Sequence, residues 1–181
     1  MYIRLIRNKP QGSAITGRLV IDGRWFCNTL ERVGYQIPAL CYHIAVTQSQ
    51  KFKRLLPLVT GVPRTPQDGY GTATPIGRAN GAMGYRQGIR FHRGSKPEHS
   101  TGCILVVADN MNDNIDNLRA NQLPGALKGI GRSAADVERE LTSLILKAQN
   151  DHEEIILEVT DFTLGTEYGY NTPCEPELQK P

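Results

Sequence analysis

The chain has 181 residues, of which 39% are hydrophobic and 22% charged, and its net charge is +3 at pH 7. This length suits one domain with its own core, and so small a net charge does not favour a nucleic-acid-binding protein. No apolar run approaches the roughly 20 residues of a spanning helix, and no signal-peptide core follows the N-terminus. We therefore expect a chain made in the cytoplasm, without nucleic-acid or membrane partners.

The first half of the sequence predicts short strands joined by turns. Asp22-Gly23 is typical of a two-residue hairpin turn between two such strands. Residues 49–58 are basic and rich in leucine, and we expect them to pack against or cap another element. Residues 63–84 predict a long irregular loop, which is a common way to shape a binding site. The strands are expected over residues 2–7, 16–21, 24–30 and 40–47.

The second half predicts helices and one more strand. A helix is expected over residues 107–121, with Asp109 as its N-cap. A clearer helix runs from Ser133 to Gln149, where Ser133 and Asp136 form a capping box. A strand is expected over residues 154–160. The sequence thus predicts one mainly β domain over residues 1–165, a β-sandwich or barrel-like fold with two or three α-helices, and a C-terminal tail over 166–181.

The four cysteines show no CxxC spacing, which argues against a zinc ribbon or a thioredoxin-like motif. Cys27 and Cys41 stand in apolar, strand-like sequence and are expected to be small core residues. Cys174 falls in the proline-containing tail, and we assign it no role. We expect neither a metal nor another cofactor.

Cys103 and His92 are the candidate reactive pair. The segment 89–92 alternates apolar and polar residues, so Arg90 and His92 are expected on one exposed strand face, beside a cleft. Ser100-Thr101-Gly102 then forms a turn that presents Cys103 before an apolar run. A thiol with an imidazole nearby is the minimum for cysteine acyl transfer, and the backbone N–H groups of Gly102 and Cys103 are candidate oxyanion donors.

His92-Arg93-Gly94 and Ser100-Thr101-Gly102-Cys103-Ile104 together resemble the signature of L,D-transpeptidase catalytic domains. That resemblance implies a Cys103 nucleophile that acts on peptidoglycan stem peptides and a His92 base. It also implies that the Arg93 backbone carbonyl orients the imidazole, with Gly102 among the oxyanion donors. Two features depart from the family: the spacing from His92 to Cys103 is shorter, and Thr101 replaces a second histidine.

The compact spacing resembles a divergent branch of small phage and bacterial proteins without established function. Two segments carry that resemblance, the Gly-Arg-Leu-x-Ile-Asp-Gly hairpin of residues 17–23 and the Phe-Lys-Arg-x-Leu-Pro segment of residues 52–57. It covers residues 12–107, whereas the resemblance to transpeptidases proper is confined to the motif.

Other interpretations of these residues remain open. Cys103 can be a buried structural thiol, and His99 can be a solvated loop residue instead of a substrate contact. Arg90 is either a clamp for substrate carboxylates or a plain surface arginine. Ser100 and Thr101 are further substrate-binding candidates. His92, His99 and Cys103 are also zinc-ligand types, although no ligand-like spacing accompanies them.

The sequence therefore predicts a cysteine-dependent L,D-carboxypeptidase or L,D-transpeptidase. Phage lysis or a secretion system would deliver it to the periplasm or cell wall, and an antibacterial effector of this kind would have an immunity protein as partner. Two alternatives are a zinc-dependent hydrolase and a non-catalytic module of a phage or secretion system that retains the fold.

Overall fold

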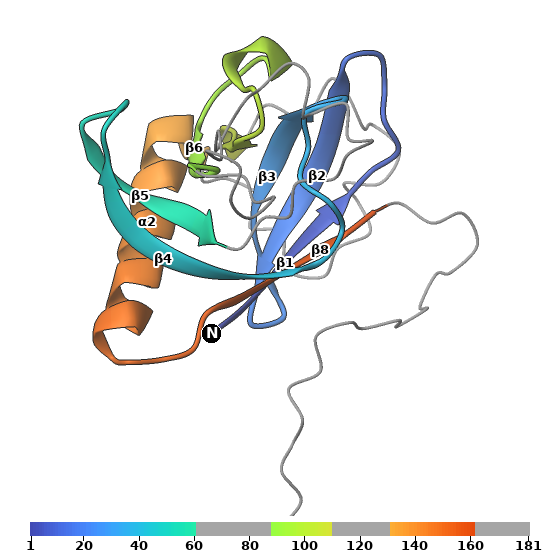
Figure 1. Cartoon of the computed structure of the whole chain (residues 1–181). Helices are drawn as coiled ribbons and strands as arrows, with labels where there is room; N and C mark the ends of the chain where they lie inside the picture. The colour runs from blue at the N-terminus through green and yellow to red at the C-terminus, as the bar shows by residue number, and fades with distance from the viewer. Residues whose placement is uncertain (61–87, 110–130, 162–181) are drawn as a thin grey trace, which may run out of the picture.

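The structure is a computed structural model that describes residues 1–60, 88–109 and 131–161. Within these ranges it is mainly β, as predicted, with eight strands in one nearly closed, barrel-like sheet (Figure 1). The strand order is β5-β4-β8-β1-β2-β3-β7-β6. The strands are β1 (Tyr2–Arg7), β2 (Ala14–Ile21), β3 (Arg24–Arg32), β4 (Cys41–Ser49), β5 (Arg54–Thr60), β6 (Phe91–Arg93), β7 (Ile104–Val106) and β8 (Ile156–Thr160).

The described residues contain one α-helix, α2 (Ala134–Asn150), and one short 3-10 helix, η1 (Pro97–His99). This is fewer than the two or three α-helices that we expected. The expected helix over 107–121 lies mostly outside the described residues, and so do the loop over 63–84 and the tail over 166–181. Helix α2 begins as predicted, because the Ser133 side chain accepts a hydrogen bond from the Asp136 N–H.

The predicted β2–β3 hairpin is confirmed, and its turn follows from two residues that accept positive φ. Asp22 has φ 47° and Gly23 has φ 80°, the backbone that a tight two-residue turn between antiparallel strands requires. The strands pair from Ile21 with Arg24 to Ala14 with Arg32. This long hairpin forms the middle of the sheet.

Residues 54–60 form strand β5, although the sequence led us to expect only a packing or capping segment there. β5 pairs with β4 along its whole length, from Ser49–Arg54 to His43–Thr60. Pro57 lacks an N–H and so cannot donate to a second neighbour, and β5 stands at the end of the strand order, where this is tolerated.

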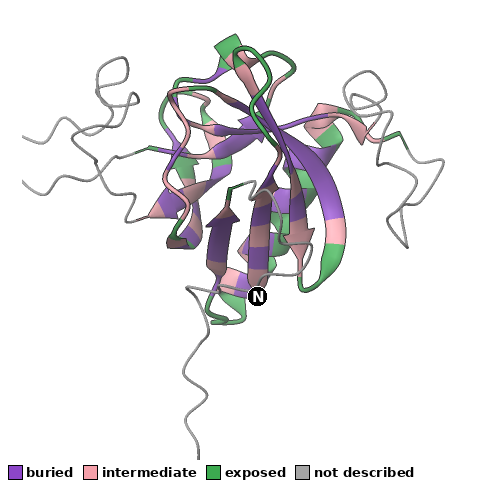
Figure 2. Cartoon of the chain, turned by 90° about the vertical axis from the view of Figure 1, so that its right-hand side faces the viewer, coloured by how far each residue is buried: buried purple, intermediate pink, exposed green. Residues whose placement is uncertain are grey.

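The main core lies between the sheet and α2, a smaller cluster is formed by Leu30, Leu105 and Val107, and Figure 2 shows the buried residues running along the strands. α2 turns Val137, Leu141 and Ile145 into the main core, and their spacing of three and four residues places them on one face of the helix. Cys27 is a buried free thiol, as expected, whereas Cys41 is disulfide-bonded, so its prediction as a plain core thiol is wrong. No helix among the described residues has the length and apolarity to cross a bilayer.

The sheet nearly closes on itself where β5 meets the segment before β6. Leu58 forms a bridge with Arg90, and the Val59 N–H donates to the Ile89 carbonyl at 2.8 Å. We call this junction the seam, defined by β5 and residues 89–93. Only a short stretch of backbone pairs across the seam. Side chains from other elements therefore accept hydrogen bonds from backbone groups there that have no strand partner. The candidate site lies beside this seam.

Candidate active site

The parallel pairing of β6 with β7 brings the two halves of the motif together. His92 pairs with Leu105, and the Ile104 N–H donates to the Arg90 carbonyl at 3.0 Å. Cys103 directly precedes β7 and is therefore offset by two residues from the position opposite His92. Such diagonal neighbours on adjacent strands have Cα atoms about 7 Å apart. The pairing of β6 with β7 thus places His92 and Cys103 near one another on neighbouring segments.

The imidazole of His92 is fixed by the next peptide. Its Nδ1 lies 2.9 Å from the Arg93 carbonyl oxygen. Because a carbonyl can only accept, Nδ1 carries the proton and Nε2 is left with the lone pair of a general base. This is the orienting contact that the resemblance implies for the Arg93 carbonyl.

The ring of His92 is covered, although we expected it on an exposed strand face. Only 4% of the residue is accessible, because Phe52 lies against the imidazole with ring centroids 4.5 Å apart. Phe52 comes from the bend between β4 and β5. The prediction of an exposed His92 is therefore wrong, since it considered the strand without the hairpin that folds over it.

The pKa of His92 is lowered, chiefly because burial disfavours the imidazolium. The hydrogen bond to Arg93 and the negative charge of Glu138 act in the opposite direction, whereas Lys51 and Arg54 lower the pKa further. The result is an imidazole that is neutral at physiological pH and able to accept a proton.

The Cys103 thiol is half-buried and engaged with backbone groups. Its Sγ lies 3.7 Å from the Gly88 carbonyl, and the Arg90 backbone N–H donates to it. Burial raises the pKa of Cys103, although that N–H and the charges of Lys51 and Arg90 partly offset the effect. In the described part of the chain the thiol makes no hydrogen bond to His92, so the resting pair is a neutral thiol beside a neutral imidazole.

The turn before Cys103 is held by its own hydrogen bonds. The Gly102 N–H donates to Ser100 Oγ at 3.0 Å, and Ser100 Oγ donates to the Cys103 carbonyl at 2.6 Å. Gly102 has φ 132°, which favours glycine. The predicted oxyanion donor Gly102 is therefore already occupied, and Ser100 shapes the turn. No described residue accepts a hydrogen bond from the Cys103 N–H, which leaves this group as the candidate donor.

Arg90 supports the β4–β5 hairpin. Its guanidinium donates to the carbonyls of Thr47, Gln48 and Leu56 and to Thr47 Oγ1, at 2.8 to 3.3 Å. A carboxylate clamp at Arg90 would have to break these bonds first.

The remaining candidates lie at the rim of the site. Thr101 and His99 are exposed, and His99 Nδ1 accepts a hydrogen bond from the Ser95 N–H at 3.3 Å. Over residues 1–60, 88–109 and 131–161, no three His, Cys, Asp or Glu side chains gather as metal ligands would. His92, His99 and Cys103 are therefore not arranged as the zinc site that their residue types allow.

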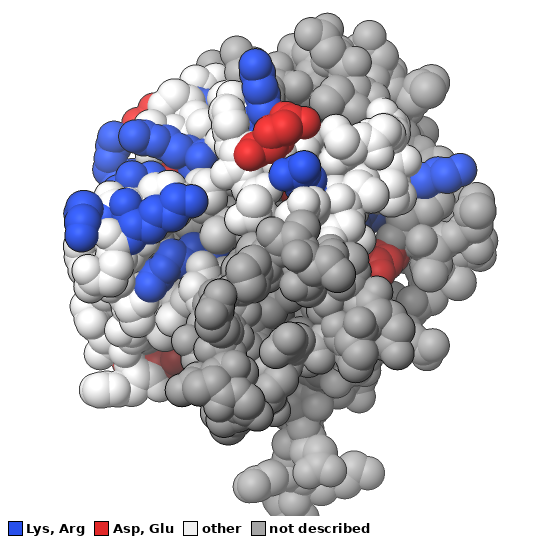
Figure 3. All heavy atoms as spheres, turned by 45° about the horizontal axis from the view of Figure 1, so that its top comes forward, with Lys and Arg blue, Asp and Glu red and all other residues white. Residues whose placement is uncertain are grey.

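Positive charge surrounds the covered imidazole. Lys51 Nζ lies 5.3 Å and the Arg54 guanidinium carbon 5.2 Å from the centre of the Phe52 ring. Figure 3 shows Lys and Arg side chains gathering at the left of the face it displays, on the side where Figure 1 has the β4–β5 hairpin. Lys51 lowers the pKa of both Cys103 and His92, so it is a cation shared by the two candidate reactive groups.

Sequence reasoning missed three residues of the site, Lys51, Phe52 and Glu138. The first two belong to the segment expected only to pack or cap, although its basic and aromatic composition was a signal. Glu138 lies in α2, next to core residue Val137, and its carboxylate accepts from the Arg93 N–H at 2.7 Å. No sequence pattern near the motif points to a residue 45 positions away.

Comparison with known proteins adds no assignment. No family model, no curated protein and no solved structure matches the chain.

Proposed function

We propose that this protein is a cysteine-dependent acyl-transfer enzyme of the L,D-transpeptidase type, with peptidoglycan stem peptides as substrates. The observation that carries the proposal is the 2.9 Å contact between His92 Nδ1 and the Arg93 carbonyl oxygen, which favours the tautomer with its proton on Nδ1. Its Nδ1 donates to the Arg93 carbonyl, and Nε2 is the free base on the strand next to Cys103. A base oriented by a third group beside a nucleophile is the arrangement that thiol acyl transfer needs.

The reaction begins as a general-base step, because both groups are neutral at rest. The thiol leaves the Gly88 carbonyl and transfers its proton to His92 Nε2 while Sγ attacks the substrate carbonyl carbon. The oxyanion that forms accepts a hydrogen bond from the Cys103 N–H. The carbon–nitrogen bond then breaks, the leaving amine takes the proton from His92, and a thioester remains on Cys103.

Water or a second amine resolves the thioester. Attack by water makes the protein an L,D-carboxypeptidase, and attack by an amine makes it an L,D-transpeptidase. Stem peptides carry several carboxylates, and Lys51 is the cation best placed to attract them, because Arg90 is bound to the hairpin. Delivery by phage lysis or by a secretion system, with an immunity protein as partner of an effector, belongs to this proposal.

The test is incubation of the purified protein with tetrapeptide muropeptides, followed by mass spectrometry. We expect either loss of the terminal D-residue or formation of a cross-linked dimer. Cys103→Ala and His92→Gln should abolish both products, whereas His43→Gln, a change at an exposed histidine, should leave them unchanged. Activity that persists in folded Cys103→Ala would contradict the proposal.

A second candidate is a non-catalytic module that retains the fold. The observation in its favour is the Gly102 N–H, which Ser100 occupies and which therefore cannot stabilise an oxyanion in this arrangement. A folded wild-type protein that binds muropeptides without converting them would favour this module over the enzyme.

A further inference from the structure

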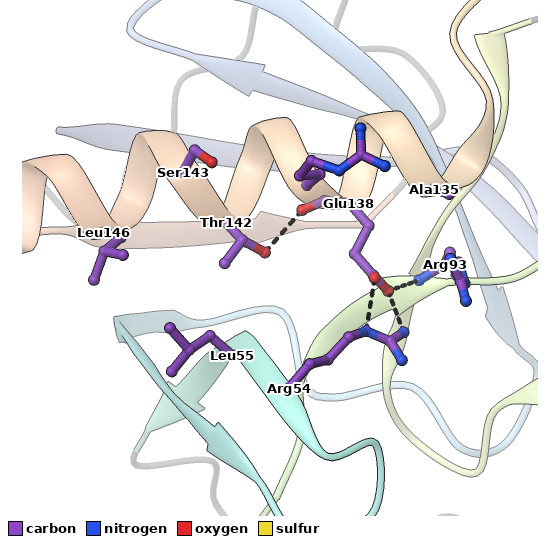
Figure 4. A pocket seen from close by; sticks show the side chains of 9 residues that line it. Arg54, Leu55, Arg93, Ala135, Glu138, Thr142, Ser143 and Leu146 are labelled. Carbon is purple, nitrogen blue, oxygen red and sulfur yellow. Dashed lines mark hydrogen bonds and ion pairs between the residues drawn. The ribbon is translucent and has the colours of Figure 1, made fainter.

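Glu138 is a nearly buried acid with three hydrogen bonds at the seam. Its side chain is 8% exposed. The Arg54 guanidinium donates to it through Nε at 2.9 Å and through a terminal nitrogen at 2.8 Å, and the Arg93 N–H donates at 2.7 Å. Figure 4 shows the carboxylate reaching from α2 toward both partners. A buried carboxylate is tolerated only with such pairing.

The geometry of the seam explains why a side chain is needed there. β6 uses one edge to pair with β7, where the Gly94 N–H donates to Val106 and the Ile104 N–H to Arg90. The Arg93 N–H points to the other edge, beyond the short bridge between β5 and Arg90. Because the backbone pairing has ended, Glu138 supplies the acceptor that a strand would otherwise give.

Arg93 is consequently held at both of its backbone groups. Glu138 accepts from its N–H, and its carbonyl accepts from His92 Nδ1. A shift of this backbone would move the carbonyl that sets the tautomer and direction of the imidazole. The carboxylate on α2 is therefore linked to the candidate base through Arg93, and within the described residues it makes no hydrogen bond to the ring itself.

A second route joins the same carboxylate to His92. Arg54, paired with Glu138, lies over the Phe52 ring, and Phe52 covers the imidazole. The charged groups that act on His92 are Glu138 from α2, Arg54 from β5 and Lys51 from the bend before it. Among the described residues, Cys103, which precedes β7, is a further titratable group beside the site, and His99 lies at its rim.

We propose that Glu138 is a positioning residue for His92, fixing the Arg93 backbone whose carbonyl orients the imidazole. The proposal deepens the proposed function and rests on it for the role of His92 as base. It concerns a group that touches neither the substrate nor the ring. The groove of about 330 Å³ beside Glu138, lined also by Arg54, Arg93 and Thr142, gives solvent a path to this pair (Figure 4).

The first experiment follows the His92 imidazole by NMR across pH and needs no activity. Glu138→Gln keeps an acceptor for the Arg93 N–H but removes a negative charge, so the pKa of His92 should fall. Arg54→Gln removes a positive charge and should raise it. Glu140→Gln is the matched control on the same helix, since Glu140 pairs with Arg132 instead. A His92 titration unchanged in both seam variants would overturn the proposal.

The second readout is the hydrogen bond itself. The Nδ1–H proton of His92 should give a low-field resonance in the wild type and in Glu138→Gln, and should lose it in Glu138→Ala. If Glu138→Ala does not fold, Glu138→Leu replaces it, because a side chain of similar size fills the same space without an acceptor. An Nδ1–H resonance that persists in the folded apolar variant would contradict positioning through Arg93.

Activity then separates the two proposals. Glu138→Ala should reduce kcat on muropeptides by about 10- to 100-fold with little change in KM, as expected for a displaced base, and Glu138→Gln should recover most of the loss. If the NMR effects appear but the wild type converts no muropeptide, the enzymatic proposal fails while the positioning role stands. If the wild type is active and Glu138→Ala matches it, the positioning role fails alone.

Discussion

The two candidate reactive residues, His92 and Cys103, are both held in their neutral forms. Burial lowers the pKa of His92 and raises that of Cys103. A preformed thiolate–imidazolium pair would need opposite shifts, as in cysteines activated by a nearby cation. The proposed reaction therefore depends on substrate binding, which would have to bring the thiol proton to His92 and displace the contact with Gly88.

Alkylation of Cys103 by iodoacetamide tests this resting state. The thiolate is the reactive form, and a raised pKa leaves less of it at neutral pH than in a free thiol of pKa about 8.5. We expect the rate to keep rising with pH above that value. Lys51→Gln should slow the reaction several-fold at pH 8, because the positive charge that favours the thiolate is lost.

Lys53→Gln is the matched control for Lys51→Gln, since it removes a charge from the same bend, whereas Lys51 and Arg90 are the cations that lower the pKa of Cys103. Cys27 is buried and should remain unlabelled in the folded protein. A rate that levels off below pH 7 would show that Cys103 is already a thiolate, and the general-base step would be wrong.

At the scale of single residues, the sequence was informative where the chemistry is local. His92, its neighbour Arg93 and the glycine before Cys103 lie within a stretch of twelve residues, and the structure brings them close together. Phe52 and Glu138 could not be predicted, because they reach His92 through the fold of a hairpin and the docking of a helix. Arg90 is the opposite case. An arginine beside the motif suggested a clamp for substrate carboxylates, but backbone carbonyls of the β4–β5 hairpin accept hydrogen bonds from its guanidinium.

At the scale of elements, the strands with clear alternation and turn residues were predictable. The strand at 2–7 and the hairpin at Asp22-Gly23 form as expected. β5 was missed because its Leu-Leu-Pro-Leu sequence lacks alternation and contains a proline, which is unusual inside a strand. Its pairing with β4 is decided by tertiary contacts that no local pattern records.

Helix α2 depends on its N-terminal cap. Ser133 Oγ accepts from the Asp136 N–H at 3.2 Å and donates to the Asp136 carboxylate at 2.6 Å. Ser133→Ala removes both bonds and should lower the free energy of unfolding by about 1 kcal/mol. Urea denaturation measures the change, and Ser133→Asp, another good cap residue, should retain most of the stability. An unchanged unfolding midpoint in Ser133→Ala would show that the cap contributes nothing.

At the scale of the whole molecule, a buried ion pair joins two central strands. Arg7 of β1 and Glu31 of β3 are each 2% exposed in their side chains and make two hydrogen bonds of 2.7 and 2.8 Å. Burial alone would lower the pKa of Arg7, but the carboxylates of Glu31 and Asp161 outweigh it and raise the pKa. Arg7 therefore stays charged throughout the range in which proteins are studied.

Breaking this pair should destabilise the whole domain. Arg7→Met leaves Glu31 buried without its partner and should cost about 3–5 kcal/mol in the free energy of unfolding. The double variant Arg7→Met/Glu31→Leu removes both charges and should recover much of the loss. Thermal and urea unfolding measure both. If the free energy of unfolding of Arg7→Met lies within about 1 kcal/mol of the wild-type value, water must reach Glu31.

Strand β8 joins two parts of the sheet that would otherwise be separate. It pairs in parallel with β1 and antiparallel with β4, so β8 is the strand that links β4 and β5 to β1, while β5 meets the other end of the sheet at the short bridge of the seam. A ribosome must therefore synthesise most of the chain before the sheet can close, and folding must bring strands more than 150 residues apart into register. Contacts of such long range slow folding, so assembly is expected to end, not begin, with the closure that completes the site.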